Sequence, residues 1–227
     1  MNATTDFEGP KELIARATSL LLLETEAVQI SLNKPFRLAS GNFSPFYINC
    51  RKVISDPLAM DLFASFAHWT CQLERINFDV VAGGESAGIP FASFLAQRLA
   101  KPMIYVRKKS KDHGIASLVE GRLTPQSRVL LIEDLITDGK SKINFLKPIR
   151  DQGATIEDCL VIFDRGQGGP QLLSEHGIRL TSLTDIRKTL LCAELGNRLK
   201  RNEVQEIETY LTDVRVWHEL RGLAFQP

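Results

Sequence analysis

Two adjacent acids and a hydroxyl-bearing loop follow an apolar run in the segment 128-RVLLIEDLITDGKSK-142. Its GKS resembles the end of a triphosphate-binding P-loop, but that pattern needs a glycine at position 134, which is Asp134 here. Backbone N–H groups at a helix start, helped by Thr and Ser hydroxyls, instead form a monophosphate site, and the preceding carboxylates would face neutral hydroxyls. The segment therefore indicates a ribose 5-phosphate site. The alternative, a solvated polar loop, leaves two acids after a buried strand without partners, which is costly.

A second candidate loop, 83-GGESAGIP-90, satisfies the GxSxG nucleophile-elbow pattern of α/β-hydrolases. That interpretation makes Ser86 the nucleophile of an esterase, with its histidine among His113, His176 and His218. No HGG-type oxyanion segment precedes it. The same Gly-rich turn can equally lay its N–H groups on an anion such as pyrophosphate. The pentapeptide alone leaves both interpretations open.

A third loop, 107-RKKSKDHG-114, gathers basic side chains and continues as IASLVEG, so that Gly114 and Gly121 permit a hinge. A charge run is ordinarily a solvated surface loop. Here it follows an apolar strand in a nearly neutral protein, which favours a basic lid over a polyphosphate. Its cations or potential cations are Arg107, Lys108, Lys109, Lys111 and His113.

Alternating strands and helices must position these loops. Apolar runs predict strands at FDVVAG, PMIYVRK, RVLLIED, IEDCLVIFDR and IRLTSLTD. Helical patterns predict helices over 11–32, from residue 56, and over 86–99, 139–152, 185–194 and 202–221. This order indicates a parallel sheet with helices on both faces, in which ligands bind beyond the carboxyl ends of the strands. Two short extended runs around SGN in residues 36–54 predict a small antiparallel piece.

We therefore expect an α/β fold in a single domain overall, with a central parallel sheet flanked by helices and a small N-terminal antiparallel hood. Its parts are an N-terminal helix and hood segment (1–55), a core (56–195) and a C-terminal helix that packs on the core or hood (196–227). In the C-terminal segment, apolar and aromatic side chains recur at helical spacing from Val204 to Trp217. That stripe indicates core or subunit contact rather than a ligand site.

Composition excludes several classes of partner. With 28 basic and 27 acidic residues the net charge is +1, so neither a nucleic acid nor an anionic membrane is an expected partner. The N-terminus has no basic region followed by an apolar one, and no apolar run is long enough to span a membrane, so a cytoplasmic location is expected. The four cysteines lie far apart and are predicted to be buried, reduced thiols: Cys50, Cys71, Cys159 and Cys192.

Taken in order, the motifs FRLASGNFSPFYINCR, GGESAGIP, RKKSKDHG, VLLIEDLITDGKS and FDRG resemble the orotate phosphoribosyltransferases, members of the type I phosphoribosyltransferases. The resemblance implies a pentosyltransferase of UMP biosynthesis that moves the 5-phosphoribosyl group from phosphoribosyl pyrophosphate (PRPP) to orotate. It also implies Mg²⁺ bound mainly through substrate, without metal ligands from the protein alone. A further implication is a homodimer in which the lid loop (107–120) completes the neighbouring active site.

The resemblance assigns roles to residues of this chain. Lys111, His113 and Asp134 would be catalytic, and the pyrophosphate loop would comprise Gly84, Glu85, Ser86, Ala87 and Gly88. Orotate would meet Ser40, Phe46, Tyr47, Thr137 and Arg165. PRPP would meet Arg107, Lys108, Lys111, His113, Glu133, Asp134, Leu135, Ile136, Thr137, Asp138, Gly139, Lys140 and Ser141, with Glu133 and Asp134 at the ribose hydroxyls and the loop from Thr137 to Ser141 around the 5-phosphate.

Three positions depart from the family pattern. Ala39 and Ala87 stand where many members carry Lys, and Arg51 or Lys52 are the candidates to replace the lost charge. Asp138 brings a negative charge beside the phosphate, so we expect its side chain to turn back onto local N–H groups while Lys140 restores the charge. A homologue that only senses ligands is a further alternative, against which the retention of the lid cations and both acids argues.

Overall fold

The computed structural model of the protein describes residues 9–38, 40–109 and 117–226. Its centre is a six-stranded sheet in the order β10-β9-β8-β5-β6-β7. The strands are β5 (Val80–Gly84), β6 (Met103–Val106), β7 (Val119–Glu120), β8 (Arg128–Ile136), β9 (Thr155–Asp164) and β10 (Arg179–Asp185). All neighbouring pairs are parallel except β6 with β7. The predicted α/β class with a central parallel sheet is confirmed, and the antiparallel edge strand β7 was not predicted.

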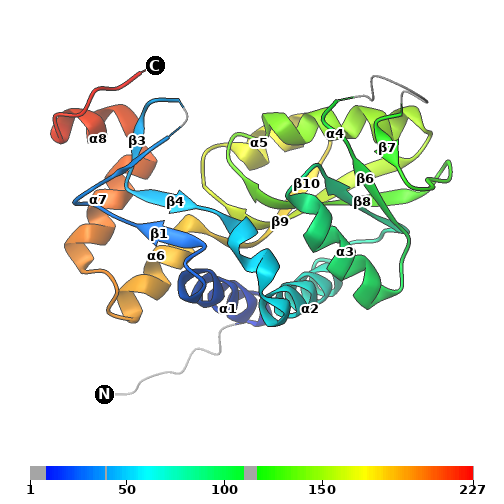
Figure 1. The fold of residues 1–227 in the computed structure, drawn as a ribbon, viewed down its shortest axis with the longest axis horizontal. Coiled ribbons are helices and arrows are strands. Elements are labelled where there is room, and N and C mark those ends of the chain that lie inside the picture. The colour runs from blue at the N-terminus through cyan, green and yellow to red at the C-terminus, as the bar shows by residue number, and fades with distance from the viewer. Residues whose placement is uncertain (1–8, 39, 110–116, 227) are drawn as a thin grey trace.

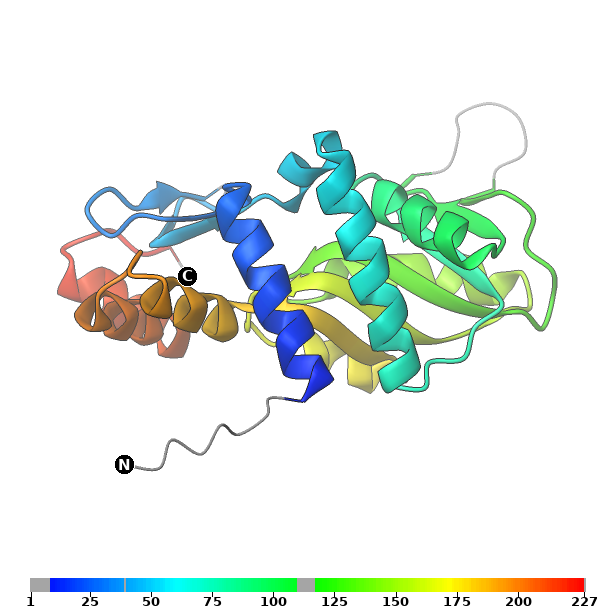
Figure 2. The ribbon, with the colours of Figure 1, turned by 90° about the horizontal axis from the view of Figure 1, so that it is seen from below.

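Helices cover both faces of this sheet. α1 (Pro10–Glu24), α2 (Pro57–Leu73) and α3 (Gly88–Leu99) lie on one side, and α4 (Lys140–Asp151) and α5 (Gly169–Glu175) lie on the other (Figures 1 and 2). α6 (Ile186–Leu195) continues directly from β10. Local signals start several of these helices, since Pro10 and Pro57 occupy first-turn positions and the Asp56 carboxylate accepts a hydrogen bond from Ala59 N–H at 3.0 Å.

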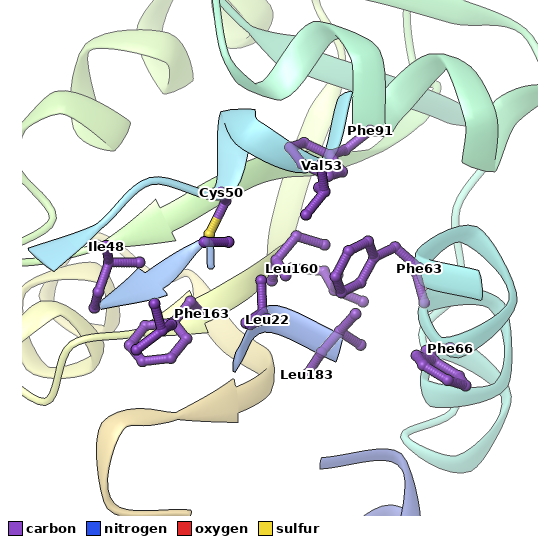
Figure 3. Packing of buried hydrophobic residues seen from close by; sticks show 14 of the residues in the cluster. Leu22, Ile48, Cys50, Val53, Phe63, Phe66, Phe91, Leu160, Phe163 and Leu183 are labelled. Carbon is purple, nitrogen blue, oxygen red and sulfur yellow. The ribbon is translucent and has the colours of Figure 1, made fainter. Parts of the chain in front are cut away.

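Alternation along the strands divides the core into two layers. In β8, Leu130 and Ile132 belong to the cluster under α1, α2 and α3, whereas Val129 and Leu131 belong to the cluster under α4 and α5. Figure 3 shows the first cluster, in which side chains from the sheet, α1, α2, α3 and the hood meet. The sheet is thus buried on both faces, as its near-continuous apolar strands require.

A hood of two small antiparallel ladders precedes the core. β1 (Val28–Ile30) pairs with β4 (Phe46–Ile48), and β2 (Phe36–Arg37) pairs with β3 (Phe43–Ser44). The 3₁₀-helix η1 (Cys50–Ser55) then leads into α2. The extended runs around SGN are confirmed, but the predicted helix over 11–32 is wrong beyond Glu24, because the chain turns at Glu26 (φ 53°) and enters β1.

Two helices, rather than the single predicted helix over 202–221, end the chain. α7 (Arg201–Thr212) and α8 (Val214–Leu220) are separated at Asp213, whose carboxylate accepts hydrogen bonds from Arg215 and Val216 N–H and caps α8. Both helices lie beside the hood (Figure 1). Tyr210 packs edge-on against Phe46 of β4, and His218 Nε2 accepts a hydrogen bond from Phe43 N–H at 3.0 Å. The C-terminal stripe therefore contacts the hood.

Two further expectations concern cysteines and membranes. Cys50, Cys71, Cys159 and Cys192 are all buried, and none of the four is in a disulfide, as predicted. Burial raises the pKa of the Cys71 thiol to about 12, with the charge of Asp158 acting in the same direction. Within residues 9–38, 40–109 and 117–226, none of the helices has the length and apolar character needed to cross a bilayer.

Candidate active site

Four loops meet at one edge of the sheet. Because β9, β8, β5 and β6 are neighbours and run parallel, their carboxyl ends lie side by side, as the sequence predicted for the loops that follow them. A pocket of about 210 Å³ lies at this edge. A larger hollow of about 450 Å³ between α1 and α2 is lined by side chains such as Leu13, Trp69 and Leu73 and by no charged residue, so size alone does not mark the site.

Predicted site residues line the pocket from several elements. The loop after β5 contributes Glu85, Ser86 and Ala87, and the loop after β6 contributes Lys108. The end of β8 contributes Glu133, Asp134 and Leu135, and the first turn of α4 contributes Ser141. Three lining residues were not among the assigned site residues: Arg51 from η1, and Lys142 and Phe145 from α4.

Glu133 and Asp134 lie on opposite faces of β8. Side chains alternate along a strand, so Glu133 continues the row of Val129 and Leu131 toward α4, and Asp134 points to the other face. Glu133 is only 4% exposed, whereas Asp134 is half-buried. The two acids that the sequence places together therefore have different surroundings.

Lys142 forms a buried ion pair with Glu133. Its Nζ lies 2.5 Å from Glu133 Oε2, and both side chains are almost fully enclosed. Burial raises the pKa of the Glu133 carboxyl, and the charge and hydrogen bond of Lys142 are the strongest opposing influences. Glu133 Oε1 has no hydrogen-bond partner among the described residues.

Two glycines of the loop after β5 make room for Glu133. A Cβ at Gly84 would lie 2.2 Å from Glu133 Oε1, and a Cβ at Gly88 would lie 2.4 Å from the same oxygen. Neither position accepts a side chain without displacement, because real Cβ contacts are essentially never under 3.0 Å. Packing against the acid of β8 is therefore one reason for glycine at positions 84 and 88.

The loop between β8 and α4 leads into a helix start, the setting in which anions commonly bind. Gly139, at φ 86°, precedes the first helical residue, and the first N–H groups of a helix have no acceptor within it. Lys140 N–H donates to Asp138 Oδ1 at 3.1 Å, and Lys140 Nζ lies 3.2 Å from Asp138 Oδ2. Both expectations for this departure are confirmed: Asp138 turns back onto a local N–H, and Lys140 balances its charge.

Opposing influences act on Asp138 itself. Burial works to raise the pKa of this carboxyl, but the hydrogen bonds and charge of Lys140 outweigh it and hold the pKa below its usual value. Thr137 is half-buried and Ile136 is buried in the same loop. Gly169 at the start of α5 packs on this loop, since a Cβ there would lie 2.6 Å from Ile136 Cγ1.

The basic side of the site is partly described. Lys108 is exposed, and its N–H donates to Glu85 Oε2 at 2.7 Å, which joins the loops after β6 and β5. The Arg107 guanidinium lies 3.5 Å from Glu120 Oε1 across the base of the lid loop. Lys111 and His113 lie outside the described residues, as does Ala39. The predicted lid and its catalytic side chains therefore remain predictions.

Arg165 joins the core to the hood. It follows β9, and its guanidinium lies over the ring of Phe46 in β4 at 5.4 Å. Burial lowers the pKa of Arg165, and its Nε is enclosed without an acceptor among the described residues. Tyr47 is 39% exposed, and Ser40 is exposed in the turn between β2 and β3.

The esterase interpretation of Ser86 requires a histidine beside it, and one of its three candidates, His113, lies outside the described residues. Within the described part of the chain, Ser86 has no hydrogen bond to a histidine. His218 is fully buried against the hood, and His176 lies exposed at the end of α5, where its ring bonds Leu172 O. Ser86 instead faces the pocket that Asp134 and Lys108 line.

Family comparison agrees with this geometry. The family model described as phosphoribosyl transferase domain matches residues 53–176, the segment from η1 to the end of α5. These residues contain the two glycine-bearing loops, the basic loop and the paired acids. The fold and site thus define a phosphoribosyltransferase of type I.

Individual relatives specify the class further. The orotate phosphoribosyltransferase of Cereibacter sphaeroides is 44% identical over 216 residues, covering 93% of each chain. The crystal structure of orotate phosphoribosyltransferase from Aeropyrum pernix is similar with a TM-score of 0.68 at 33% identity, over 78% of this chain and 97% of that one. Leishmania donovani UMP synthase is similar with a TM-score of 0.75 at 25% identity, over 87% of this chain, which spans 42% of that one. The chain belongs to the orotate phosphoribosyltransferase family.

Proposed function

We propose that the protein transfers the 5-phosphoribosyl group of PRPP to N1 of orotate, giving orotidine 5-monophosphate and pyrophosphate. The observation that carries the proposal is the common pocket: acids for a diol, a helix start for a phosphate and basic side chains for pyrophosphate lie at one sheet edge. Family membership at 44% identity over most of the chain supports the same activity.

PRPP fits this arrangement from end to end. Its 5-phosphate would lie on the N–H groups and hydroxyls of the loop from Thr137 to Ser141, where the α4 dipole favours an anion. Its ribose hydroxyls would face Glu133 and Asp134. Its pyrophosphate would lie between the 84–88 loop and the cations of the lid loop, including Arg107, Lys108, Lys111 and His113.

Orotate would bind between the core and the hood. Arg165 carries a charge in that region, and its Nε has no acceptor within the described part of the chain, which suits the carboxylate of orotate. Tyr47 would supply apolar contact, and Ser40 and Thr137 would supply polar contact. Phe46, which is fully buried, would support Arg165 rather than contact orotate itself. The hood thereby distinguishes an anionic pyrimidine from a neutral base.

The chemistry requires charge stabilisation rather than a protein nucleophile. As the C1–O bond lengthens, positive charge grows on the ribose and negative charge grows on the leaving pyrophosphate. Lys111, His113 and Arg107 would stabilise the leaving group, and one well-placed donor contributes about 3 kcal/mol in such a role. Orotate N1 attacks as an anionic or readily ionised atom, so the site mainly positions the reactants and excludes water.

Mg²⁺ suits this site as a partner of the substrate. The described residues contain no group of three or more His, Cys, Asp or Glu side chains that could hold a metal ion, whereas PRPP offers phosphate and hydroxyl oxygens. When bound, Mg²⁺ would neutralise charge on the leaving pyrophosphate. Asp134, half-buried beside the pocket, is the described acid best placed to face it through the ribose hydroxyls.

The remaining proposals concern assembly and location. We propose a cytoplasmic homodimer, without nucleic-acid or membrane partners, in which the lid loop 107–120 of one subunit closes on the site of the other. Closure would exclude water during transfer. We also propose a division of the chain into segments 1–55, 56–195 and 196–227. In this division the C-terminal segment packs on the hood of the first segment through Tyr210 and His218.

The direct test mixes the protein, orotate, PRPP and Mg²⁺ and follows the loss of orotate absorbance. The proposal predicts loss that depends on both PRPP and Mg²⁺. Reaction of adenine in place of orotate would overturn the assignment of orotate as the substrate but not the class of enzyme. PRPP binding without any turnover would favour a ligand-sensing role, and hydrolysis of an activated ester that Ser86→Ala abolishes would favour the esterase.

A further inference from the structure

Lys142 occupies a position where a lysine is costly. It lies in the first turn of α4 on the face that packs against the sheet, beside Phe145, and it is 7% exposed. An ion pair enclosed in this way contributes little net stability, because the desolvation of both groups offsets their attraction. We therefore expect Lys142 to have a role other than stabilising the fold.

Lys142 contacts only one of the two carboxylate oxygens of Glu133. It contacts Glu133 Oε2, while Oε1 lies against Gly84 and Gly88 and has no partner among the described residues. A buried carboxylate oxygen that lacks a donor is rare, and here it belongs to a residue that lines the pocket. The missing donor is supplied most simply by a bound ligand.

We propose that Lys142 is a positioning residue, which holds the Glu133 carboxylate by Oε2 so that Oε1 receives a ribose hydroxyl of PRPP. The inference rests on the proposed function and adds a residue to it. Gly84 and Gly88 complete the arrangement, since their bare backbones leave the space that the carboxylate occupies. Glu133 would touch the substrate, and Lys142 would act only through Glu133.

Direct contact between Lys142 and the 5-phosphate is the competing explanation. The Lys142 side chain is 8% exposed and already paired, whereas the Lys140 side chain is 81% exposed at the phosphate loop. Lys140 is therefore the cation available to the phosphate. It also provides a matched control, because Lys140→Met removes the same charge two residues away.

The charges around Glu133 determine how a substitution should behave. Lys142 faces it from α4, Asp134 from its own strand, Lys108 from the loop after β6, and the Cys159 thiol from β9. Without Lys142, burial and Asp134 would raise the pKa of Glu133 further, and Lys108 alone would oppose them. The Glu133 carboxyl would therefore ionise at a higher pH in Lys142→Met than in the wild type.

The test measures binding of Mg²⁺–PRPP by isothermal titration calorimetry without orotate, from about pH 6 to about pH 9, for Lys142→Met, Glu133→Gln/Lys142→Met and Lys140→Met. Lys142→Met should bind about tenfold more weakly at the acidic end of this range, as losses of positioning partners commonly do, and should recover as the pH rises. The double variant, which has no unpaired buried charge, should keep its melting temperature and bind weakly at every pH. Lys140→Met should show no such pH dependence.

Distinct results would overturn the inference. A pH-independent loss in Lys142→Met would mean direct phosphate contact. Wild-type affinity in the double variant would mean a merely structural role, and this outcome is decisive even if Lys142→Met fails to fold. If the wild type itself does not bind Mg²⁺–PRPP, the proposed function fails first and the inference fails with it, and that case is recognised before any variant is measured.

Discussion

The guanidinium of Arg165 lies over the ring of Phe46, 5.4 Å from its centroid, and so connects the end of β9 to strand β4 of the hood. Phe46 is fully buried and packs in turn on Tyr210 of α7. Arg165 is thereby fixed at the boundary between core and hood, with an enclosed Nε that lacks an acceptor among the described residues. The region between core and hood is where we place orotate.

Arg165→Met should weaken the binding of orotate without weakening that of PRPP. A hydrogen bond to a charged group contributes about 1.5–3 kcal/mol, so KM for orotate should rise about 10- to 100-fold while KM for PRPP stays within about twofold. Steady-state kinetics with each substrate varied in turn measures this. Arg187→Met is the control, because Arg187 forms an exposed ion pair with Glu208 and should leave both constants unchanged. Equal rises for both substrates would contradict the placement of orotate.

Arg51, rather than Lys52, should replace the cations missing at Ala39 and Ala87. Arg51 lines the pocket and bonds only the Asn49 amide among the described residues, whereas Lys52 lies 3.3 Å from Glu26 Oε2 and does not line the pocket. Arg51→Ala should raise KM for PRPP about tenfold or more, and Lys52→Ala should change it less than about twofold. Titration of PRPP at saturating orotate measures both. The opposite order of effects would mean that Lys52 supplies the charge.

A lid that crosses between subunits predicts complementation. Lys111→Ala and Asp134→Asn should each be nearly inactive with the fold intact. In an equal mixture of refolded or co-expressed subunits, half of the dimers should be mixed, and each should contain one intact site. Activity should therefore return to about one quarter of the wild-type value. Lys109→Ala serves as the control for a lid lysine without an assigned contact. If the mixture stays as inactive as its components, the lid acts within its own subunit.

The buried thiol of Cys71 predicts a loss of stability at high pH. Burial raises its pKa to about 12, so the unfolded chain releases this proton first as the pH rises. The folded state then binds more protons than the unfolded state, and the free energy of unfolding should fall by about 1.4 kcal/mol per pH unit above about pH 8.5 on account of this group. Urea unfolding of the wild type and Cys71→Ala at several pH values isolates the contribution. Parallel pH profiles for the two proteins would contradict it.

Much of the fold follows from local patterns in the sequence. The apolar runs that became β5, β8 and β9 are buried on both faces, so composition alone identifies them. The turn from α1 into β1 could not be found in this way, because β1 depends on pairing with β4, a partner distant in sequence, while apolar residues continue at helical spacing past Glu24. The break at Asp213 could have been predicted from the sequence, because Asp is a strongly preferred N-cap residue and Asp213 caps the start of α8.

The site likewise has features that the sequence predicts and features that it does not. The loops after β5, β6, β8 and β9 could be placed together because ligands bind beyond the carboxyl ends of parallel strands. The pairing of Asp138 with Lys140 followed from the need to balance a negative charge beside a phosphate. Lys142 was missed, although strand alternation carried the signal: Glu133 continues the row of Val129 and Leu131, so it had to face α4 and required a cation there. The contact between Arg165 and Phe46 depends on the packing of the hood, which no local pattern reports.

The most direct measurement is the stoichiometry and structure of the product formed from orotate and PRPP with Mg²⁺. We predict one pyrophosphate released for each orotate consumed, and a product in which NMR shows the ribose C1 bonded to orotate N1. The product should not form with Asp134→Asn, whose fold stays intact. Release of pyrophosphate without consumption of orotate, or ribosylation of a different base in preference to orotate, would contradict the account.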